Sequence, residues 1–251
     1  MSHNFRSRLR NGERLYGTMV TLPTPASAEI LADVGFDWLF VDGEHGPLST
    51  VEILSILQAV DDRIPCLVRV PAADVVSINR VLDLGAVGVI APQINSAEAA
   101  EAVVTAARYA PDGARGVGLA RAHGYGMAFD TYIGNANEQT TVVVQAEHAE
   151  SVENIDSIVA VPGIDAVLLG PYDLAASLGK MGAVDDLVVT QAIRRVTTVC
   201  QSAGIPLGYF GVTADAVRAY AQVGYQLLIC GTDTLFLGTA AGKTLSQLRE
   251  M

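Results

Sequence analysis

The sequence predicts one (β/α)8 barrel, an α/β fold of the TIM-barrel class, as a single domain over residues 1–251. Three observations support this prediction. The chain has 251 residues, and a barrel of this class needs roughly 250. Short apolar runs alternate with longer amphipathic stretches along the whole chain. A junction of helix, glycine and strand recurs at 31–37, 82–88 and 221–226, which indicates a repeated strand–helix unit.

Eight short runs rich in Val, Ile and Leu are the predicted strands. Their continuous apolar character is typical of a parallel sheet that is covered on both faces. The runs are RLYGTMVTL (14–22), DWLFVDGEH (37–45), PCLVRVP (65–71), GVIAPQI (88–94), TVVVQAE (141–147), AVLLGPYD (166–173), PLGYFGV (206–212) and QLLICGTD (226–233). No break in composition separates them, which favours one closed barrel.

The stretches between these runs have the signals of helix ends. The segments 27–35, 49–62 and 96–110 open with Ser, a favoured N-cap. Glycines near 35, 85, 204 and 224 are placed to end helices in the left-handed conformation. An open doubly wound sheet would show the same alternation, but no GxGxxG follows the first strand. The segment 111–139 is rich in glycine and long for a connection, which is typical of a functional or interfacial loop.

The composition excludes several classes of protein. A formal net charge of −11 disfavours a nucleic-acid partner. The three cysteines, Cys66, Cys200 and Cys230, form neither a disulfide framework nor a zinc motif, and we expect buried thiols. No apolar run reaches the ~18 residues of a membrane-spanning helix. The N-terminal apolar stretch is short and contains prolines, which argues against a signal peptide. We therefore expect a cytoplasmic protein without a membrane partner.

Polar side chains gather where the predicted strands end, the place where barrel enzymes carry their catalytic groups. Glu147 and Asp173 end neighbouring strands, so both carboxylates could reach one cation. Two carboxylates with water and a chelating substrate suit Mg²⁺ or Mn²⁺. The alternatives are two solvated loop acids, or Asp173 as the N-cap of the following helix.

Arg69 and His45 are the other candidates for chemistry at these strand ends. Arg69 ends an otherwise apolar strand, where it could bind a carboxylate or stabilise an oxyanion. The alternative is an ion pair with Asp42, Glu44 or Glu147. His45 is a candidate general base or proton relay, against the alternative of a structural histidine. Neither lysine of the chain lies on a predicted strand, so a carbonyl substrate would have to be polarised by a metal.

Taken together, these motifs resemble the HpcH/HpaI family of class II pyruvate aldolases, typified by 4-hydroxy-2-oxoheptanedioate aldolase. The resemblance covers nearly the whole chain, and the motifs are specific in combination. They are GFDWLFVDGEHGP (35–47), LVRVP (67–71), LDLGAVGVIAPQI (82–94), PDGARGVG (111–118), VVVQAE (142–147), VLLGPYDLAASLG (167–179) and GTDT (231–234).

The resemblance implies a catalytic set, position by position. Glu147 and Asp173 match the ligands of a divalent metal (Mg²⁺, Mn²⁺ or Co²⁺), which would chelate the keto oxygen and carboxylate of pyruvate. Arg69 matches an arginine that contacts the keto oxygen and stabilises the enolate. His45 matches a catalytic histidine, and Asp83 matches its carboxylate partner. Asp83 follows from the resemblance alone, because LDLG otherwise suggests an acidic residue at a helix end.

Further residues have supporting or substrate-binding parts in the same resemblance. Asp42 and Glu44 would orient the proton network, and Gln145 matches a glutamine next to the metal or substrate. Backbone N–H groups at Tyr172 and Asp173 would hold the pyruvate carboxylate.

The chain also departs from the family pattern. Met19 and Val212 fall where members shape the pocket for the acceptor aldehyde, and Tyr172 takes a position that is small in some members. The loop at 119–130 matches no known substrate.

The implied activity is a carbon–carbon lyase that cleaves or forms 4-hydroxy-2-oxo acids from an aldehyde and the enolate of pyruvate or hydroxypyruvate. One alternative is an oxaloacetate decarboxylase or a citrate-forming synthase that uses the same enolate. Another is a non-catalytic barrel with a binding or assembly role, which the complete candidate set argues against. The resemblance also implies a homo-oligomer, a hexamer built as a trimer of dimers, with the helix at 235–248 exchanged between subunits.

Overall fold

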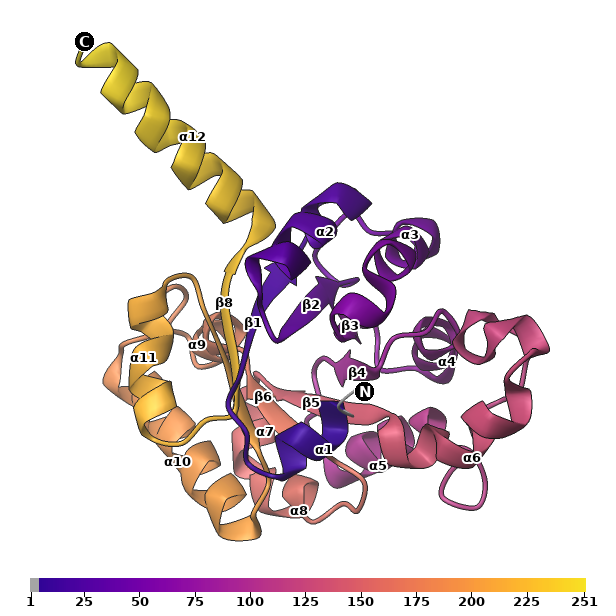
Figure 1. Ribbon diagram of the computed structural model, residues 1–251. Helices are drawn as coiled ribbons and strands as arrows, with labels where there is room; N and C mark the ends of the chain where they lie inside the picture. The colour runs from indigo at the N-terminus through magenta and orange to yellow at the C-terminus, as the bar shows by residue number, and fades with distance from the viewer. Residues whose placement is uncertain (1–4) are drawn as a thin grey trace.

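Eight parallel strands close into a barrel within residues 5–251, the part of the chain that this computed structural model describes. Each strand pairs with the next one along the chain, and the last pairs with the first (Figure 1). The strands are β1 (Leu15–Val20), β2 (Trp38–Asp42), β3 (Cys66–Arg69), β4 (Gly88–Ala91), β5 (Thr141–Ala146), β6 (Ala166–Leu169), β7 (Leu207–Gly211) and β8 (Leu227–Thr232). The predicted barrel is confirmed, and every strand lies within a predicted run.

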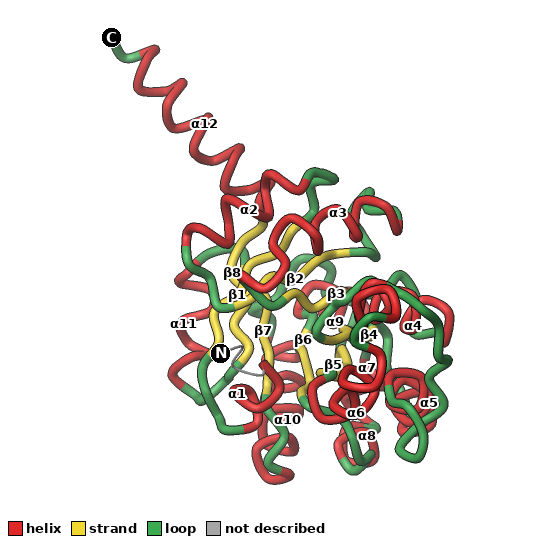
Figure 2. The backbone as a smooth tube through the Cα atoms, turned by 45° about the vertical axis from the view of Figure 1, so that its right-hand side comes forward, coloured by secondary structure: helices red, strands yellow, loops and turns green. Residues whose placement is uncertain are grey.

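Helices cover the outside of the barrel (Figure 2). The helices of the described residues are α1 (Phe5–Arg10), α2 (Pro25–Val34), α3 (Thr50–Val60), α4 (Val75–Asp83), α5 (Ala97–Ala107), α6 (Phe129–Gln139), α7 (Ala149–Glu153), α8 (Ile155–Val159), α9 (Pro171–Ser177), α10 (Leu187–Ala203), α11 (Ala214–Gln222) and α12 (Asp233–Arg249), of which α12 does not cover the barrel; the 3-10 turns are η1 (Asp61–Arg63) and η2 (Arg121–Gly126). The long connection at 111–139 therefore contains η2 and the additional helix α6.

The helix ends confirm most of the predicted caps. Ser49 and Ser96 are N-caps, and Gly35 and Gly204 close their helices in the left-handed region. The expected start of a helix at 27 was wrong. Helix α2 begins two residues earlier because the Thr24 hydroxyl accepts the N–H of Ala26 and a proline follows at the first helical position.

The apolar side chains form two layers. Those that point outward from the strands pack under the helices. Those that point inward, among them Trp38 and Phe40, fill the barrel. The Trp38 ring lies against Gly17, where an added Cβ would come within 2.5 Å of it, so β1 requires glycine there. Phe5 of α1 packs on Trp38 with ring centroids 5.8 Å apart, and α1 thereby covers the amino end of the barrel.

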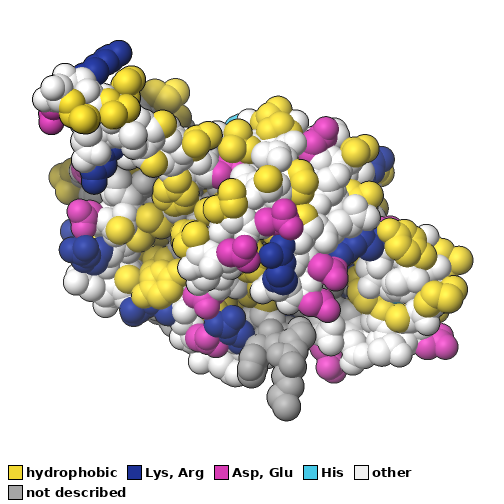
Figure 3. All heavy atoms as spheres, turned by 45° about the horizontal axis from the view of Figure 1, so that its top comes forward, with side chains coloured by type: hydrophobic (Ala, Val, Ile, Leu, Met, Phe, Trp, Pro, Cys, Tyr) yellow, Lys and Arg dark blue, Asp and Glu magenta, His cyan; other side chains and the backbone are white. Residues whose placement is uncertain are grey.

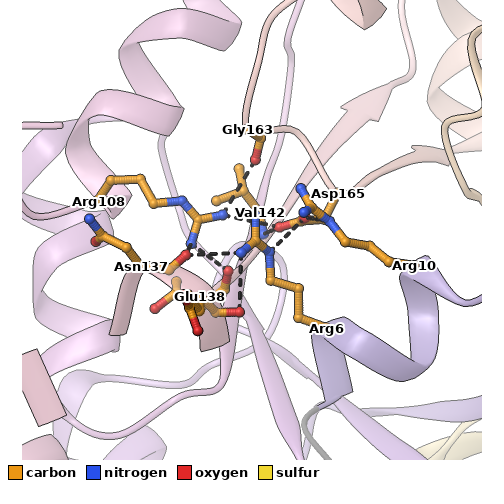
Figure 4. A network of polar contacts seen from close by, with 9 residues as sticks. Arg6, Arg10, Arg108, Asn137, Glu138, Val142, Gly163 and Asp165 are labelled. Atoms are coloured by element: carbon orange, nitrogen blue, oxygen red, sulfur yellow. Dashed lines mark hydrogen bonds and ion pairs between the residues drawn. The ribbon is translucent and has the colours of Figure 1, made fainter. Parts of the chain in front are cut away.

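Asp165, which precedes β6, ties α1 to the strands through a buried charge network (Figure 4). Its Oδ1 accepts from Nε of Arg6 and of Arg10, each at 2.8 Å. Its Oδ2 accepts from Arg108 Nη2 at 3.2 Å and from the Val142 N–H at 2.9 Å. Removal of this carboxylate alone would leave buried guanidinium groups without a compensating charge, which is strongly destabilising.

Helix α12 departs from the barrel and projects away from it (Figures 1 and 2). All of its residues after Asp233 are exposed. They include the large apolar side chains of Leu235, Phe236, Leu237, Leu245 and Leu248. Figure 3 shows hydrophobic atoms along this helix and on the body of the molecule beside it.

Two further expectations concern the rest of the described chain. Cys66 and Cys200 are buried free thiols as expected, whereas Cys230 is only half-buried. Among residues 5–251, no helix is both long and apolar enough to cross a membrane.

Candidate active site

A pocket of about 300 Å³ opens at the carboxyl ends of the strands. It is lined by Met19, Thr21, Phe40, Asp42, His45, Arg69, Gln145, Leu168, Leu169, Gly170, Pro171, Tyr172, Asp173 and Phe210. The parallel strands bring these positions together because all of their carboxyl ends meet at one rim. Most of the candidate residues predicted from the sequence therefore lie in or beside one cavity.

The best-defined polar contact in this cavity joins Arg69 to Asp42. The two residues are direct neighbours in the register of β2 and β3. Arg69 Nε donates to Asp42 Oδ1 at 2.9 Å and Nη2 donates to Oδ2 at 2.7 Å, a bidentate pair between buried groups. Burial alone would raise the pKa of Asp42, but the hydrogen bonds and charge of Arg69 outweigh it and hold that pKa below its usual value.

The ion-pair alternative for Arg69 is thus what the structure shows, and it leaves one end of the guanidinium directed at the pocket. Arg69 Nη1 lies 3.2 Å from Glu44 Oε2 and 3.5 Å from Gln145 Oε1. The guanidinium carbon also lies 5.1 Å from the centre of the Phe40 ring. Asp42 and Phe40 therefore fix the group so that Nη1 can donate to an anionic oxygen.

Glu147 is the most deeply buried candidate ligand, with 2% of its surface exposed. Its Oε1 accepts from the backbone N–H of Gln93 at 2.8 Å, and its Oε2 accepts from the side-chain amide of Gln145. Burial raises its pKa to about 7, and the negative charges of Asp173 and Glu44 act in the same direction against the lowering effect of the Gln93 N–H.

The backbone of Gln93 is a functional feature that the sequence did not show. Gln93 adopts a left-handed conformation with φ of 56°, a strained geometry for a residue with a side chain. This geometry presents its N–H to Glu147. Gln93 lies in the predicted strand run 88–94, but it follows the end of β4 at Ala91, and the sequence carries no signal for its conformation.

Asp173 and Tyr172 lie in the first turn of α9 and line the pocket. Helix α9 begins after Gly170 without a side-chain cap, so the interpretation of Asp173 as an N-cap was wrong. A Cβ at Gly170 would lie 2.8 Å from Glu147 Oε2, which explains why glycine is needed between the two candidate ligands.

Three acidic side chains, Glu44, Glu147 and Asp173, lie close to one another. The negative charges of Glu44 and Asp173 raise the pKa of Glu147, so the carboxylates repel one another. A hard cation with oxygen ligands would relieve this repulsion. Within the described residues, no three His, Cys, Asp or Glu side chains are grouped to hold a metal.

The structure does not bring His45 and Asp83 together within one chain. His45 lines the pocket with 64% of its side chain exposed, and its Nε2 lies 3.7 Å from Glu44 Oε2. Asp83 is the last residue of α4 and accepts from Arg115 Nη2 at 2.8 Å. It does not line the pocket.

The wall of the pocket differs in part from the prediction. Met19 lines it, whereas Val212 is 40% exposed and is not among the lining residues. Phe210, which was missed, takes that place on β7. The two-residue alternation of a strand could have found it, because Tyr209 packs outside the barrel and Phe210 therefore points inward.

Three comparisons with known proteins extend over nearly the whole chain. The family model of HpcH/HpaI aldolase/citrate lyase matches residues 16–239. A 4-hydroxy-2-oxovalerate aldolase of Novosphingobium aromaticivorans is 40% identical over 254 residues, covering 99% of this chain and 95% of the relative. A hydroxypyruvate/pyruvate aldolase of Paraburkholderia phytofirmans is 36% identical, covering 97% and 96%. The crystal structure of an HpcH/HpaI aldolase/citrate lyase family protein from Burkholderia cenocepacia J2315 superimposes with a TM-score of 0.93 at 37% identity, covering 97% of this chain and 98% of that one.

Proposed function

The chain belongs to the HpcH/HpaI aldolase/citrate lyase family, as its sequence predicted, and from this premise we propose that it is a divalent-metal-dependent 2-oxo-acid aldolase. The names of its relatives confirm the expected class, a lyase that acts on carbon–carbon bonds. The proposed reaction cleaves or forms a 4-hydroxy-2-oxo acid, with the enolate of pyruvate or hydroxypyruvate and an aldehyde as the other partners. The observation that supports it is the fixed Arg69 guanidinium facing a pocket beside two candidate metal ligands.

Glu147 and Asp173 would hold the metal, which supplies Lewis-acid polarisation of the keto oxygen when bound. Arg69 Nη1 donates a hydrogen bond to the same oxygen and stabilises the negative charge that develops on it in the enolate. Asp42 keeps the guanidinium in place, so little reorganisation is needed as the charge forms. Gln145 contacts both Arg69 and Glu147 and sets their relative position.

The remaining candidates would act on the carboxylate and on protons. The backbone N–H groups of Tyr172 and Asp173, in the first turn of α9, favour binding of the pyruvate carboxylate. His45 is exposed at the pocket mouth, where it can exchange protons with water; it would give a proton to the aldehyde oxygen as the new C–C bond forms, and remove the proton from that hydroxyl in the cleavage direction.

The activity is tested with a panel of 4-hydroxy-2-oxo acids, by measuring pyruvate release before and after exhaustive chelation. We expect chelation to abolish release and Mg²⁺, Mn²⁺ or Co²⁺ to restore it. Full activity of the chelated enzyme would contradict the metal assignment. Turnover of oxaloacetate, with no aldol cleavage and no aldehyde addition across the panel, would favour the decarboxylase alternative.

We also propose that α12 packs on a second copy of the chain, as a helix exchanged between subunits. Its support is the exposed apolar surface of a helix that projects from its own barrel. Light scattering should then show a homo-oligomer, for which we expect a hexamer, and a monomer at micromolar concentration would contradict this. The cytoplasmic location stays a prediction from the sequence.

A further inference from the structure

The carboxylate of Asp233 joins the start of α12 to the loop that follows β1. Asp233 is 6% exposed although it is the first residue of a projecting helix. Its Oδ1 accepts from the Thr21 N–H at 3.0 Å and from the Thr21 hydroxyl at 2.8 Å. Its Oδ2 accepts from the Leu22 N–H at 2.9 Å. One side chain thus holds two consecutive backbone groups and the hydroxyl of Thr21.

Thr21 forms part of the pocket on the side away from the candidate metal ligands. It follows β1, and in a closed barrel of consecutive strands β1 lies across the axis from β5, which Glu147 follows. Thr21 and Met19 line the pocket on this far side. A group that reacts with an enolate held near Glu147 and Arg69 would therefore approach along the wall that contains Thr21.

We propose that Asp233 is a positioning residue that fixes Thr21 against the start of α12 and thereby shapes the binding site of the acceptor aldehyde. This inference rests on the proposed aldolase function. The Thr21 hydroxyl donates its proton to Asp233, so the oxygen of this pocket-lining residue can act toward a ligand only as an acceptor; its other polar neighbour is Thr234 Oγ1 at 3.5 Å. The Thr21 oxygen is set to accept a hydrogen bond from a hydroxyl on the acceptor, which favours hydroxyaldehydes over unsubstituted aldehydes.

A structural test needs no activity. In Asp233→Asn, we expect the amides of Thr21 and Leu22 to exchange with deuterium faster than in the wild type, because one carboxylate oxygen is lost. Asp215→Asn is the matched control, since Asp215 is also in the first turn of a helix but is 84% exposed and pairs with Arg218. Unchanged protection in Asp233→Asn would overturn the link between α12 and the loop, whatever reaction the enzyme catalyses.

A kinetic test separates positioning of the acceptor from general damage. We expect Asp233→Asn to raise KM for a hydroxyaldehyde by up to about tenfold, because the acceptor would lose one hydrogen bond to the displaced Thr21 oxygen. The exchange of pyruvate C3 protons, which requires no acceptor, should change much less. An equal fall in both activities, or an unchanged KM, would overturn the proposal.

A double-mutant cycle with Thr21→Val then tests whether Asp233 acts through Thr21. The double variant should be no worse than the more impaired single variant, whereas additive effects would contradict the coupling. Absence of pyruvate exchange in the metal-loaded wild type would instead refute the aldolase function itself, and the deuterium experiment would still decide the contact.

Discussion

Metal binding should weaken as the pH falls from 8 to 6, because the Glu147 carboxyl must lose its proton before it can bind a cation. Burial raises the pKa of this carboxyl to about 7, with Asp173 and Glu44 adding to the shift. In the metal-free protein, this group therefore holds a proton at a pH where an exposed glutamate is ionised. A cation competes directly with that proton.

The size of the effect follows from the pKa. With a pKa of about 7, roughly one-eleventh of the Glu147 carboxyls are ionised at pH 6 and ten-elevenths at pH 8, so the apparent affinity should fall about tenfold. The same carboxyl changes the stability of the metal-free protein in the opposite direction, because its contribution falls as the pH rises. Its folded-state pKa is raised above the ordinary value of 4.5, so Glu147 contributes fully to the stability of the metal-free fold below pH 4.5. The contribution is lost as the pH rises through about 7.

Isothermal titration of Mn²⁺ at pH 6, 7 and 8, each in two buffers of different ionisation enthalpy, measures both the affinity and the protons released. Close to one proton should be released at pH 6 and almost none at pH 8. Glu147→Gln, which cannot ionise, should bind weakly and lose the pH dependence. Equal affinity of the wild type at pH 6 and pH 8, or no proton release at pH 6, would refute this account of Glu147.

Three further substitutions follow from the same contacts. Arg69→Ala should abolish exchange of pyruvate C3 protons, followed by NMR in D₂O, and retained exchange would contradict its role at the enolate oxygen. Gly170→Ala should weaken metal binding at least about tenfold, because the new Cβ displaces the carboxylate of Glu147; unchanged affinity in a folded variant would be inconsistent with this. Asp165→Ala should lower the free energy of unfolding in urea by about 3–5 kcal/mol, since it leaves buried guanidinium groups uncompensated. Asp156→Ala, which breaks an exposed pair with an arginine, should cost less than about 1 kcal/mol, and equal losses would count against the network.

The strands were predictable because both faces of each are buried, which leaves continuous apolar runs of a fixed length. The elements that the pattern did not reveal are those whose burial depends on other parts of the chain. Helix α1 has few apolar residues, and its role is visible only where Phe5 meets Trp38 and where its arginines meet Asp165. Likewise, the apolar pattern of α12 is compatible with an ordinary covering helix, and only the resemblance to the family indicated that this helix leaves its own barrel.

The rim of the barrel was predictable for a different reason. Parallel strands place their carboxyl ends at one edge, so Arg69 and Glu147 had to lie near each other once the strands were known. Local backbone conformation was not accessible in this way, and the left-handed backbone of Gln93 has no sequence signal. The inward direction of Phe210 was accessible, because it follows from the alternation of side chains along β7.

Mixed oligomers can test whether Asp83 of one copy pairs with His45 of another. Within one chain it pairs with Arg115 at the end of α4, while His45 lies at the pocket mouth. If Asp83 is the partner of His45, it must therefore reach that histidine from a second copy. Neither His45→Ala nor Asp83→Ala would then be active alone, but co-refolding them at equal amounts would give about one quarter of the sites an intact pair, by random association across a symmetric interface. Recovery of about that fraction of wild-type activity would assign the dyad across the subunit boundary. No recovery, in oligomers shown to contain both chains, would limit Asp83 to its contact with Arg115.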